Sequence, residues 1–217
     1  AKRFNDLSTL KLGLDTNRDM TMIRMIREAV GKNVELMVDA GRFFARDVNT
    51  ASRMARNLER YEVSWLEEPL PPDDIEGYSE LRHLVNIPIA AGEMESTRYG
   101  FREYLVKRAV DILQPDVTRA GGLSEAKKIT DMAQTWNVSL VPHSWSTAIN
   151  MAASLHLVAS MKNGYLAEFR AEPCPWMNEL LIEPLKVSKG YIDVPKGPGL
   201  GLEINEETLH RYGLIQQ

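Results

Sequence analysis

Seven ionisable side chains recur through this chain at nearly even intervals, each at or just after the end of a short apolar run. Successive members are 23 to 28 residues apart. They are Lys11, Asp39, Glu67, Glu93, Asp116, His143 and Glu168. Lysine, histidine and carboxylate groups exchange protons, and carboxylates also bind hard cations. The pattern predicts a site for proton transfer assembled from the ends of successive elements.

Three consecutive members of this series are carboxylates: Asp39, Glu67 and Glu93. Neighbouring carboxylates in a confined pocket do not all ionise unless a cation offsets their repulsion. An all-oxygen donor set favours Mg²⁺, with Mn²⁺ as the next choice. The alternative is that each acid is an exposed strand-end or helix-cap residue. The adjacent Glu68 and Glu95 are expected to support the site or to lie at the surface.

His143 and Asp116 follow neighbouring apolar runs and are expected to form an acid–base pair. A carboxylate bonded to one imidazole nitrogen fixes the tautomer and raises the basicity of the ring. The remaining histidines, His83, His156 and His210, fall in helical patterns and are expected to be structural.

Two further cations have open roles. Lys11 ends the first run, where a nearby metal ion would lower its pKa and give a neutral amine base; the alternative is a surface lysine. Arg119 either contacts substrate or neutralises Asp116, and the ion pair is favoured.

Glu168 ends the last run, and a salt bridge with Arg170 is its structural alternative.

The spacing of the series matches one strand, one loop, one helix and a return loop, which is the repeat of parallel β/α proteins. Strands are expected at 34–39, 63–67, 87–91, 110–114, 138–142 and 165–169, after a first run ending at Lys11. Helices are expected at 18–30, 50–61, 75–84, 98–108, 124–136 and 147–161, with Ser124 as an N-cap. The prediction is an α/β, TIM-like barrel of parallel strands whose carboxyl ends meet at one mouth.

Two regions are expected. Residues 1–170 form a partial barrel, and the Pro- and Gly-rich residues 171–217 form an irregular tail. The tail is expected to pack back on the barrel or on a missing cap domain and to end in a short helix over 206–212. Because seven strands are visible and an eight-unit barrel needs one more, we expect the chain to be the C-terminal part of a longer protein or its ordered remainder.

The bulk composition excludes several kinds of partner. A net charge of −4 and a pI near 5.7 provide no basic field for nucleic acid or an anionic membrane. Cys174 is the single cysteine, so no disulfide framework is expected. No apolar stretch approaches the ~20 residues that span a bilayer. A soluble cytoplasmic protein is the expectation.

Five segments together resemble the enolase superfamily, in particular its mandelate racemase group. They are VDAG (38–41), WLEEP (65–69), AAGE (90–93), QPDVTRAGG (114–122) and VPHSW (141–145). The resemblance covers nearly the whole chain. It implies a (β/α)₇β barrel preceded by an α+β capping domain, and we expect that domain and the first barrel strand to be missing from this chain. It also implies that the metal is Mg²⁺ and that the family is homo-oligomeric.

The same resemblance implies roles for individual residues. Asp39, Glu67 and Glu93 match the metal ligands, Asp116 and His143 match a catalytic dyad, Lys11 matches a base, and Glu168 matches a protonated acid that bonds the substrate carboxylate. Two departures stand out. Thr9 replaces the first lysine of a Lys-x-Lys motif, and the asparagine that is usual after the first metal-ligand motif is either replaced by Gly41 or deleted. Glu95 and Trp145 fall where residues would face the substrate.

The implied chemistry is Mg²⁺-dependent removal of the proton next to a carboxylate through an enediolate. Dehydration of a sugar acid to a 2-keto-3-deoxy acid is the expected outcome, with a small-molecule carboxylate as substrate. A racemase or epimerase using two bases is the first alternative. A metal-binding barrel without activity is the second.

Overall fold

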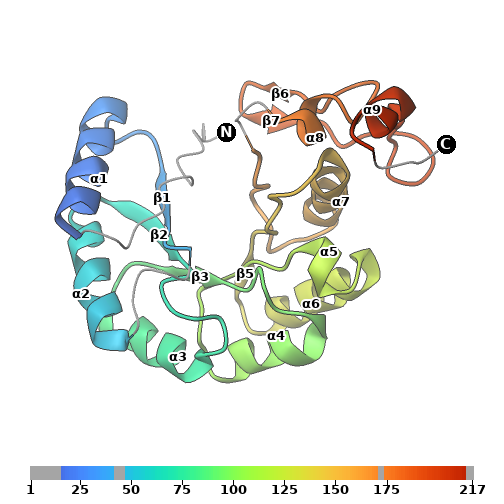
Figure 1. The fold of residues 1–217 in the computed structure, drawn as a ribbon. Helices are drawn as coiled ribbons and strands as arrows, with labels where there is room; N and C mark the ends of the chain where they lie inside the picture. Colours follow the sequence, from blue (N-terminus) through green and yellow to red (C-terminus); the bar gives the residue numbers. More distant parts are fainter. Residues whose placement is uncertain (1–15, 42–46, 171–173, 214–217) are drawn as a thin grey trace.

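The computed structural model describes residues 16–41, 47–170 and 174–213. Its centre is a five-stranded parallel sheet in the order β1-β2-β3-β4-β5. The strands are β1 (Leu36–Asp39), β2 (Val63–Glu67), β3 (Ile89–Ala91), β4 (Ile112–Leu113) and β5 (Ser139–Leu140). Sequential strands are also neighbours in space, so each connection is a crossover that advances by one strand. The described strands confirm the parallel β/α barrel-like fold, and Figure 1 shows them on the inside of an arc of helices.

Seven helices are described before the tail. They are α1 (Thr16–Val30), α2 (Val48–Glu59), α3 (Ile75–Leu84), α4 (Thr97–Val106), α5 (Val117–Ala120), α6 (Leu123–Thr135) and α7 (Ala148–Ala159). The six helices predicted from periodicity are confirmed, with ends within two residues. α5 was not predicted because one turn is too short to carry a helical period.

The strands are buried on both faces, which explains their unbroken apolar runs. On the outer face they meet the helices in a core that includes Leu36, Leu66, Ile89, Leu113 and Leu140. Alternate residues point to the inside of the arc, where a smaller cluster joins the strands. That cluster contains Trp65, Ala90, Ile112 and Val141.

The predicted cap of α6 at Ser124 is wrong. The helix begins one residue earlier, at Leu123, and Gly122 is its N-cap. Gly121 and Gly122 have φ values of 111° and 87°, so the chain reverses there in a conformation that glycine tolerates. The amide of Ala126 then donates to the carbonyl of Gly122.

The predicted strand over 165–169 is also wrong. The residue just before this segment, Gly164, makes one isolated parallel bridge with Leu140, in which the Leu140 amide donates to Asn163 O at 3.2 Å. In a parallel ladder the next donor on this side would be residue 142. That residue is Pro142, which has no N–H, so the ladder stops after one bridge.

The tail contains α8 (Pro175–Asn178), β6 (Val187–Ser188), β7 (Tyr191–Ile192) and α9 (Glu206–Arg211). Figure 1 shows these elements beyond α7 at one end of the arc. Buried Cys174, Met177 and Leu181 pack against Met151 and Leu155 of α7. The tail therefore shares an apolar cluster with the last helix of the arc.

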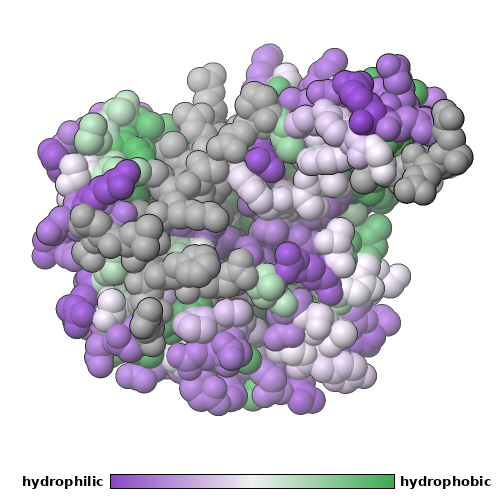
Figure 2. Space-filling model, in the orientation of Figure 1, coloured by the Kyte–Doolittle hydropathy of each residue, from purple (hydrophilic) through white to green (hydrophobic). Residues whose placement is uncertain are grey.

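The surface over α2, α3 and α4 is predominantly hydrophilic, at the lower edge of Figure 2. This fits helices whose apolar faces are turned to the sheet. Within the described ranges, none of the helices combines the length and apolar character needed to cross a bilayer.

Candidate active site

Three predicted acids lie at or just beyond the carboxyl ends of β1, β2 and β3. Asp39 and Glu67 are the last residues of their strands and pair directly in the parallel register. Glu93 follows β3 after Gly92, whose φ is 130°. A Cβ at Gly92 would lie 2.9 Å from Phe101 Cε1. The glycine of the AAGE segment is therefore needed to bring the chain past the buried Phe101 ring to Glu93.

Glu67 is the most buried of these acids, with only 8 % of it exposed. Burial raises its pKa well above the usual range, and the negative charges of Asp39 and Glu168 raise it further. Glu93 adds to the effect, and a hydrogen bond from Gln114 opposes it. The carboxylates at this end of the sheet thus share one region of negative potential.

The donor chemistry of this region fits a hard divalent cation. The side chains offer carboxylate oxygens, and their mutual repulsion is what a cation would relieve. In the positions seen across the described residues, no three His, Cys, Asp or Glu side chains are grouped so as to hold a metal ion. The assignment of Asp39, Glu67 and Glu93 as ligands stays a prediction.

The structure brings the predicted pair together across β4 and β5. His143 Nδ1 lies 2.7 Å from Asp116 Oδ2, and Asp116 is only 2 % exposed. On the other side of the ring, His143 Nε2 lies 3.2 Å from Glu93 Oε2. The imidazole therefore joins the acid–base pair to the carboxylates at the ends of β1 to β3.

The surroundings of His143 favour its charged form. Burial lowers its pKa, but the hydrogen bond to Asp116 and the negative charges of Glu168 and Glu93 outweigh burial and raise the pKa to about 9. For Asp116, burial raises the pKa, and hydrogen bonds from His143 and Thr118 more than compensate, so the net pKa is lowered. At neutral pH these shifts favour an imidazolium facing a carboxylate.

Two residues that hold Asp116 were missed from the sequence. Thr118 donates to Asp116 Oδ1 from its amide at 2.7 Å and from its hydroxyl at 2.5 Å. Asn150 Nδ2 donates to Asp116 Oδ2 at 3.2 Å. An Asp followed two residues later by Thr is a local turn signal that the sequence offers. Asn150 is 34 residues away and gives no such signal.

Glu168 and Arg170 make contacts with the loop after β5, and the role of Glu168 toward the substrate stays a prediction. Glu168 Oε2 accepts a hydrogen bond from the Ser144 amide. The Arg170 guanidinium lies 4.9 Å above the Trp145 ring centre, a cation–π arrangement. Both contacts connect the segment after Gly164 to the loop after β5.

The ion pair expected between Arg119 and Asp116 is absent from the described part of the chain. Arg119 is exposed and donates to Met94 Sδ instead, since Asp116 is already surrounded by neutral donors and His143. Lys11 lies outside the described residues, as do Thr9 and the rest of the first run.

Glu68 and Glu95 were expected beside the site or at the surface, and the structure places them in different surroundings. Glu68 is 1 % exposed and lies close enough to Tyr78 and Tyr104 for its charge to raise the pKa of each phenol, after the larger effect of burial. Glu95 Oε1 accepts from the Ser96 amide.

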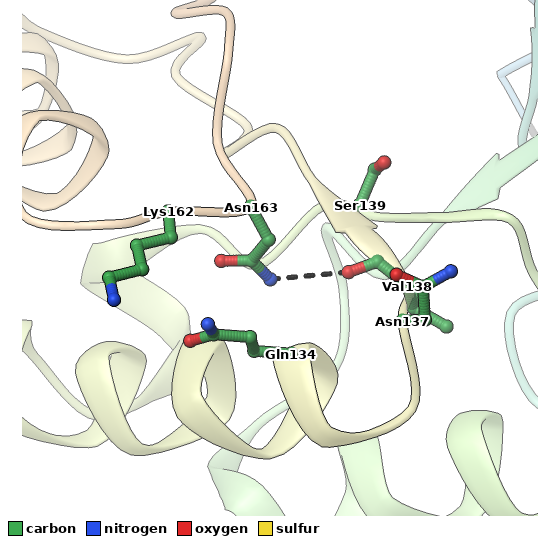
Figure 3. Close-up of a pocket in the computed structure, with 6 residues that line it drawn as sticks. All are labelled: Gln134, Asn137, Val138, Ser139, Lys162 and Asn163. Carbon is green, nitrogen blue, oxygen red and sulfur yellow. Dashed lines mark hydrogen bonds between the residues drawn. The ribbon is translucent and has the colours of Figure 1, made fainter.

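A hollow of about 260 Å³ lies at the amino end of β5, away from His143. Figure 3 shows the side chains around it, including the bond from Asn163 Nδ2 to Val138 O at 3.2 Å. Its lining is Gln134, Asn137, Val138, Ser139, Lys162 and Asn163. It lacks the carboxylates and the histidine of the mouth, and in β/α barrels the chemistry lies at the carboxyl ends of the strands.

A parallel β/α arc with acids and a His–Asp pair at its carboxyl ends defines a class of barrel enzyme folds. Residues 3–208 match the family described as enolase C-terminal domain-like, and the chain belongs to this family. The resemblance to the enolase superfamily and its mandelate racemase group is thereby confirmed.

Named relatives have similar sequences. D-galactarolactone cycloisomerase from Agrobacterium fabrum is 35 % identical over 211 residues, covering 94 % of this chain and 55 % of that protein. L-rhamnonate dehydratase from Saccharopolyspora erythraea is 38 % identical over 205 residues, covering 90 % and 50 %. The chain spans about half the length of the curated relatives it matches.

Solved structures agree with this relationship. The crystal structure of the 3,6-anhydro-D-galactonate cycloisomerase from Zobellia galactanivorans superimposes with a TM-score of 0.87 at 39 % identity. The match covers 93 % of this chain and 56 % of that one.

Proposed function

We propose that this chain is the catalytic barrel of an enzyme that removes the proton next to the carboxylate of a sugar acid and dehydrates it to a 2-keto-3-deoxy acid. The observation that carries the proposal is the contact between His143 Nε2 and Glu93 Oε2 at 3.2 Å. It puts a proton-exchanging ring beside the acids proposed to hold a divalent cation.

In this proposal His143 exchanges a proton at Nε2, and Asp116 keeps the ring in the required orientation through Nδ1. Protonated His143 is suited to give a proton to a departing hydroxyl, and neutral His143 to accept the proton next to the carboxylate. Lys11 is proposed as the base on the opposite face. Glu168 is proposed to bond the substrate carboxylate.

Asp39, Glu67 and Glu93 are proposed to hold Mg²⁺, or Mn²⁺ in its place. When bound, the cation would supply electrostatic stabilisation of the negative charge that develops on the substrate carboxylate. The homo-oligomer and the cytoplasmic location stay predictions.

The names of the relatives support dehydration. D-xylonate dehydratase of Haloferax volcanii, at 30 % identity, and arabinonate dehydratase of Saccharolobus solfataricus, at 32 %, add to the rhamnonate enzyme. Two cycloisomerases among the relatives favour a second candidate, cycloisomerisation of a sugar-acid derivative. Racemisation or epimerisation through the same first proton transfer is a further alternative.

A screen of sugar acids with Mg²⁺, read as formation of 2-keto acid, tests the proposal. His143→Asn is expected to lower kcat by about 10²–10⁴-fold, the usual contribution of a general acid or base. His83→Asn is the control, because His83 is exposed on α3 and its Nδ1 contacts Ser79 O of the same helix. If the wild type and His143→Asn turn over every substrate equally, the assignment of His143 as the acid–base group is wrong. Turnover to an isomer without keto acid would favour the second candidate.

A further inference from the structure

Asp116 is held by four hydrogen bonds, two to each oxygen. Oδ1 accepts from the amide and the hydroxyl of Thr118. Oδ2 accepts from His143 Nδ1 at 2.7 Å and from Asn150 Nδ2 at 3.2 Å. An ionised carboxylate has about four lone-pair positions, so this one is saturated. The Asn150 amide therefore shares with His143 the oxygen on which the pair depends.

Asn150 is built into the fold so that its amide has little freedom. It lies in the first turn of α7 and is 1 % exposed. Its Oδ1 accepts from Ser154 Oγ at 3.5 Å, one turn further along the helix. With its carbonyl oxygen directed to Ser154, its NH₂ group is directed to Asp116.

The capping of α7 does not require this side chain. Thr147 is the N-cap, and its hydroxyl oxygen accepts from the backbone N–H of Asn150. An asparagine serving only the helix end would use its side chain as the cap. Here the cap comes from another residue, and the Asn150 side chain crosses to the loop after β4. The first turn of α7 also carries the positive end of the helix dipole, which favours an anion there.

We propose that Asn150 is a positioning residue for the His143–Asp116 pair. Its NH₂ group holds Asp116 Oδ2 in the plane that faces His143 Nδ1, so that Nε2 is presented to the mouth of the barrel. This inference rests on the proposed function only for its kinetic consequence, because the hydrogen-bond geometry exists with or without turnover.

The proton on His143 Nδ1 gives a direct readout. In wild-type protein labelled with ¹⁵N-histidine, this proton is expected as a low-field resonance in slow exchange with water, assigned by its loss in His143→Asn. Asn150→Leu and Asn150→Ala both remove the donor to Asp116. The leucine keeps a similar side-chain volume, and the alanine favours the helix. In each, exchange of the Nδ1 proton is expected to accelerate by about tenfold or more, because one charged hydrogen bond to the carboxylate is lost.

Asn163→Ala is the matched control. It also removes a side-chain amide, but this amide donates to Thr130 O and Val138 O and has no contact with Asp116. It is expected to keep wild-type exchange. Wild-type exchange of the Nδ1 proton in either folded Asn150 variant would overturn the proposal.

Kinetics separate this inference from the proposed function. With a substrate that the wild type dehydrates, the Asn150 variants are expected to lose about tenfold in kcat with KM changed less than about twofold, because a misplaced acid–base group affects the transition state more than binding. Full kcat in both variants would contradict the inference and leave the proposed function intact. Absence of turnover in the wild type on every sugar acid would contradict the proposed function, while the exchange rates would still decide the role of Asn150.

Discussion

Glu67 is the residue at which the stability of the fold and the proposed metal chemistry oppose each other. Its raised pKa means that the folded state binds more protons than the unfolded state over the range between the two pKa values. Stability is therefore lost as pH rises through that range and the buried carboxyl ionises. A protein retains such a group when something else compensates for it, here the proposed cation.

At pH 8 in a chelator, Glu67→Gln is expected to raise the unfolding temperature by about 2–4 °C, the shift that about 1 kcal/mol gives in a chain of this size. Added Mg²⁺ at about 100 times its dissociation constant should stabilise the wild type by about 2.7 kcal/mol and the variant much less. Thermal unfolding with and without Mg²⁺ measures both effects. Glu80→Gln, on the exposed face of α3, should change neither. Equal stabilisation by Mg²⁺ of wild type and Glu67→Gln would contradict the metal assignment.

The pH dependence of stability should report the His143–Asp116 pair in the chelated protein. The folded-state pKa of His143 is raised from 6.5 to about 9, so its contribution is fully present below pH 6.5 and is lost as pH rises through about 9. Denaturant unfolding from pH 6 to pH 10 should show the wild type losing more stability than His143→Asn over this window. Parallel pH profiles for the two proteins would show that the ring is not held by the carboxylates.

Gly92 decides how the loop after β3 carries Glu93 to the mouth. An alanine there would have a φ of 130°, and its Cβ would meet the ring of Phe101, which is fully buried. Gly31, just after α1, also has a positive φ, 71°, but nothing lies within 4 Å of a Cβ there.

Gly31→Ala should therefore cost about 1–2 kcal/mol of backbone strain alone. Gly92→Ala should cost about 1–3 kcal/mol more, since overpacking is added to strain, and it should weaken Mg²⁺ binding. Chemical denaturation and calorimetric titration with Mg²⁺ compare the two variants. If both cost the same and bind Mg²⁺ equally, the close approach to Phe101 does not position Glu93.

The elements of this chain were largely predictable because the helices keep an apolar period of about 3.6 residues and the strands are short unbroken apolar runs. The two strands that end on Asp39 and Glu67 end at those residues as predicted. The predicted end strand failed because its pairing depends on a neighbour, Pro142, whose missing N–H interrupts the ladder. The contact of Asn150 with Asp116 joins elements 34 residues apart, and such a tertiary contact leaves no local period in the sequence.

At the scale of the whole molecule, an apolar cluster that includes Met151, Leu155 and Leu181 joins the tail to the arc of helices. Leu181 is 2 % exposed in this cluster, while its neighbour Ile182 is 55 % exposed. The two side chains have the same number of carbon atoms, so they form a matched pair. The difference between the losses of unfolding free energy on replacing each by alanine shows whether packing of the tail on α7 stabilises the whole protein.

Leu181→Ala is expected to cost about 2–5 kcal/mol through lost burial and a cavity, and Ile182→Ala under about 1 kcal/mol. Calorimetry should show one unfolding transition that moves to lower temperature in Leu181→Ala. A separate low-temperature transition for the tail, with the main transition unchanged, would show that the tail unfolds independently of the barrel.

The account as a whole depends on proton removal from the carbon next to a carboxylate. Incubation of the protein with sugar acids in D₂O, followed by NMR of the recovered substrate and product, measures this step directly. We predict loss of the hydrogen from that carbon and deuterium at C3 of the 2-keto-3-deoxy product; both need Mg²⁺, stop in a chelator and fall by at least about 10²-fold in Glu67→Gln and in His143→Asn. Incorporation that is unchanged in these variants and in the chelator would contradict the account.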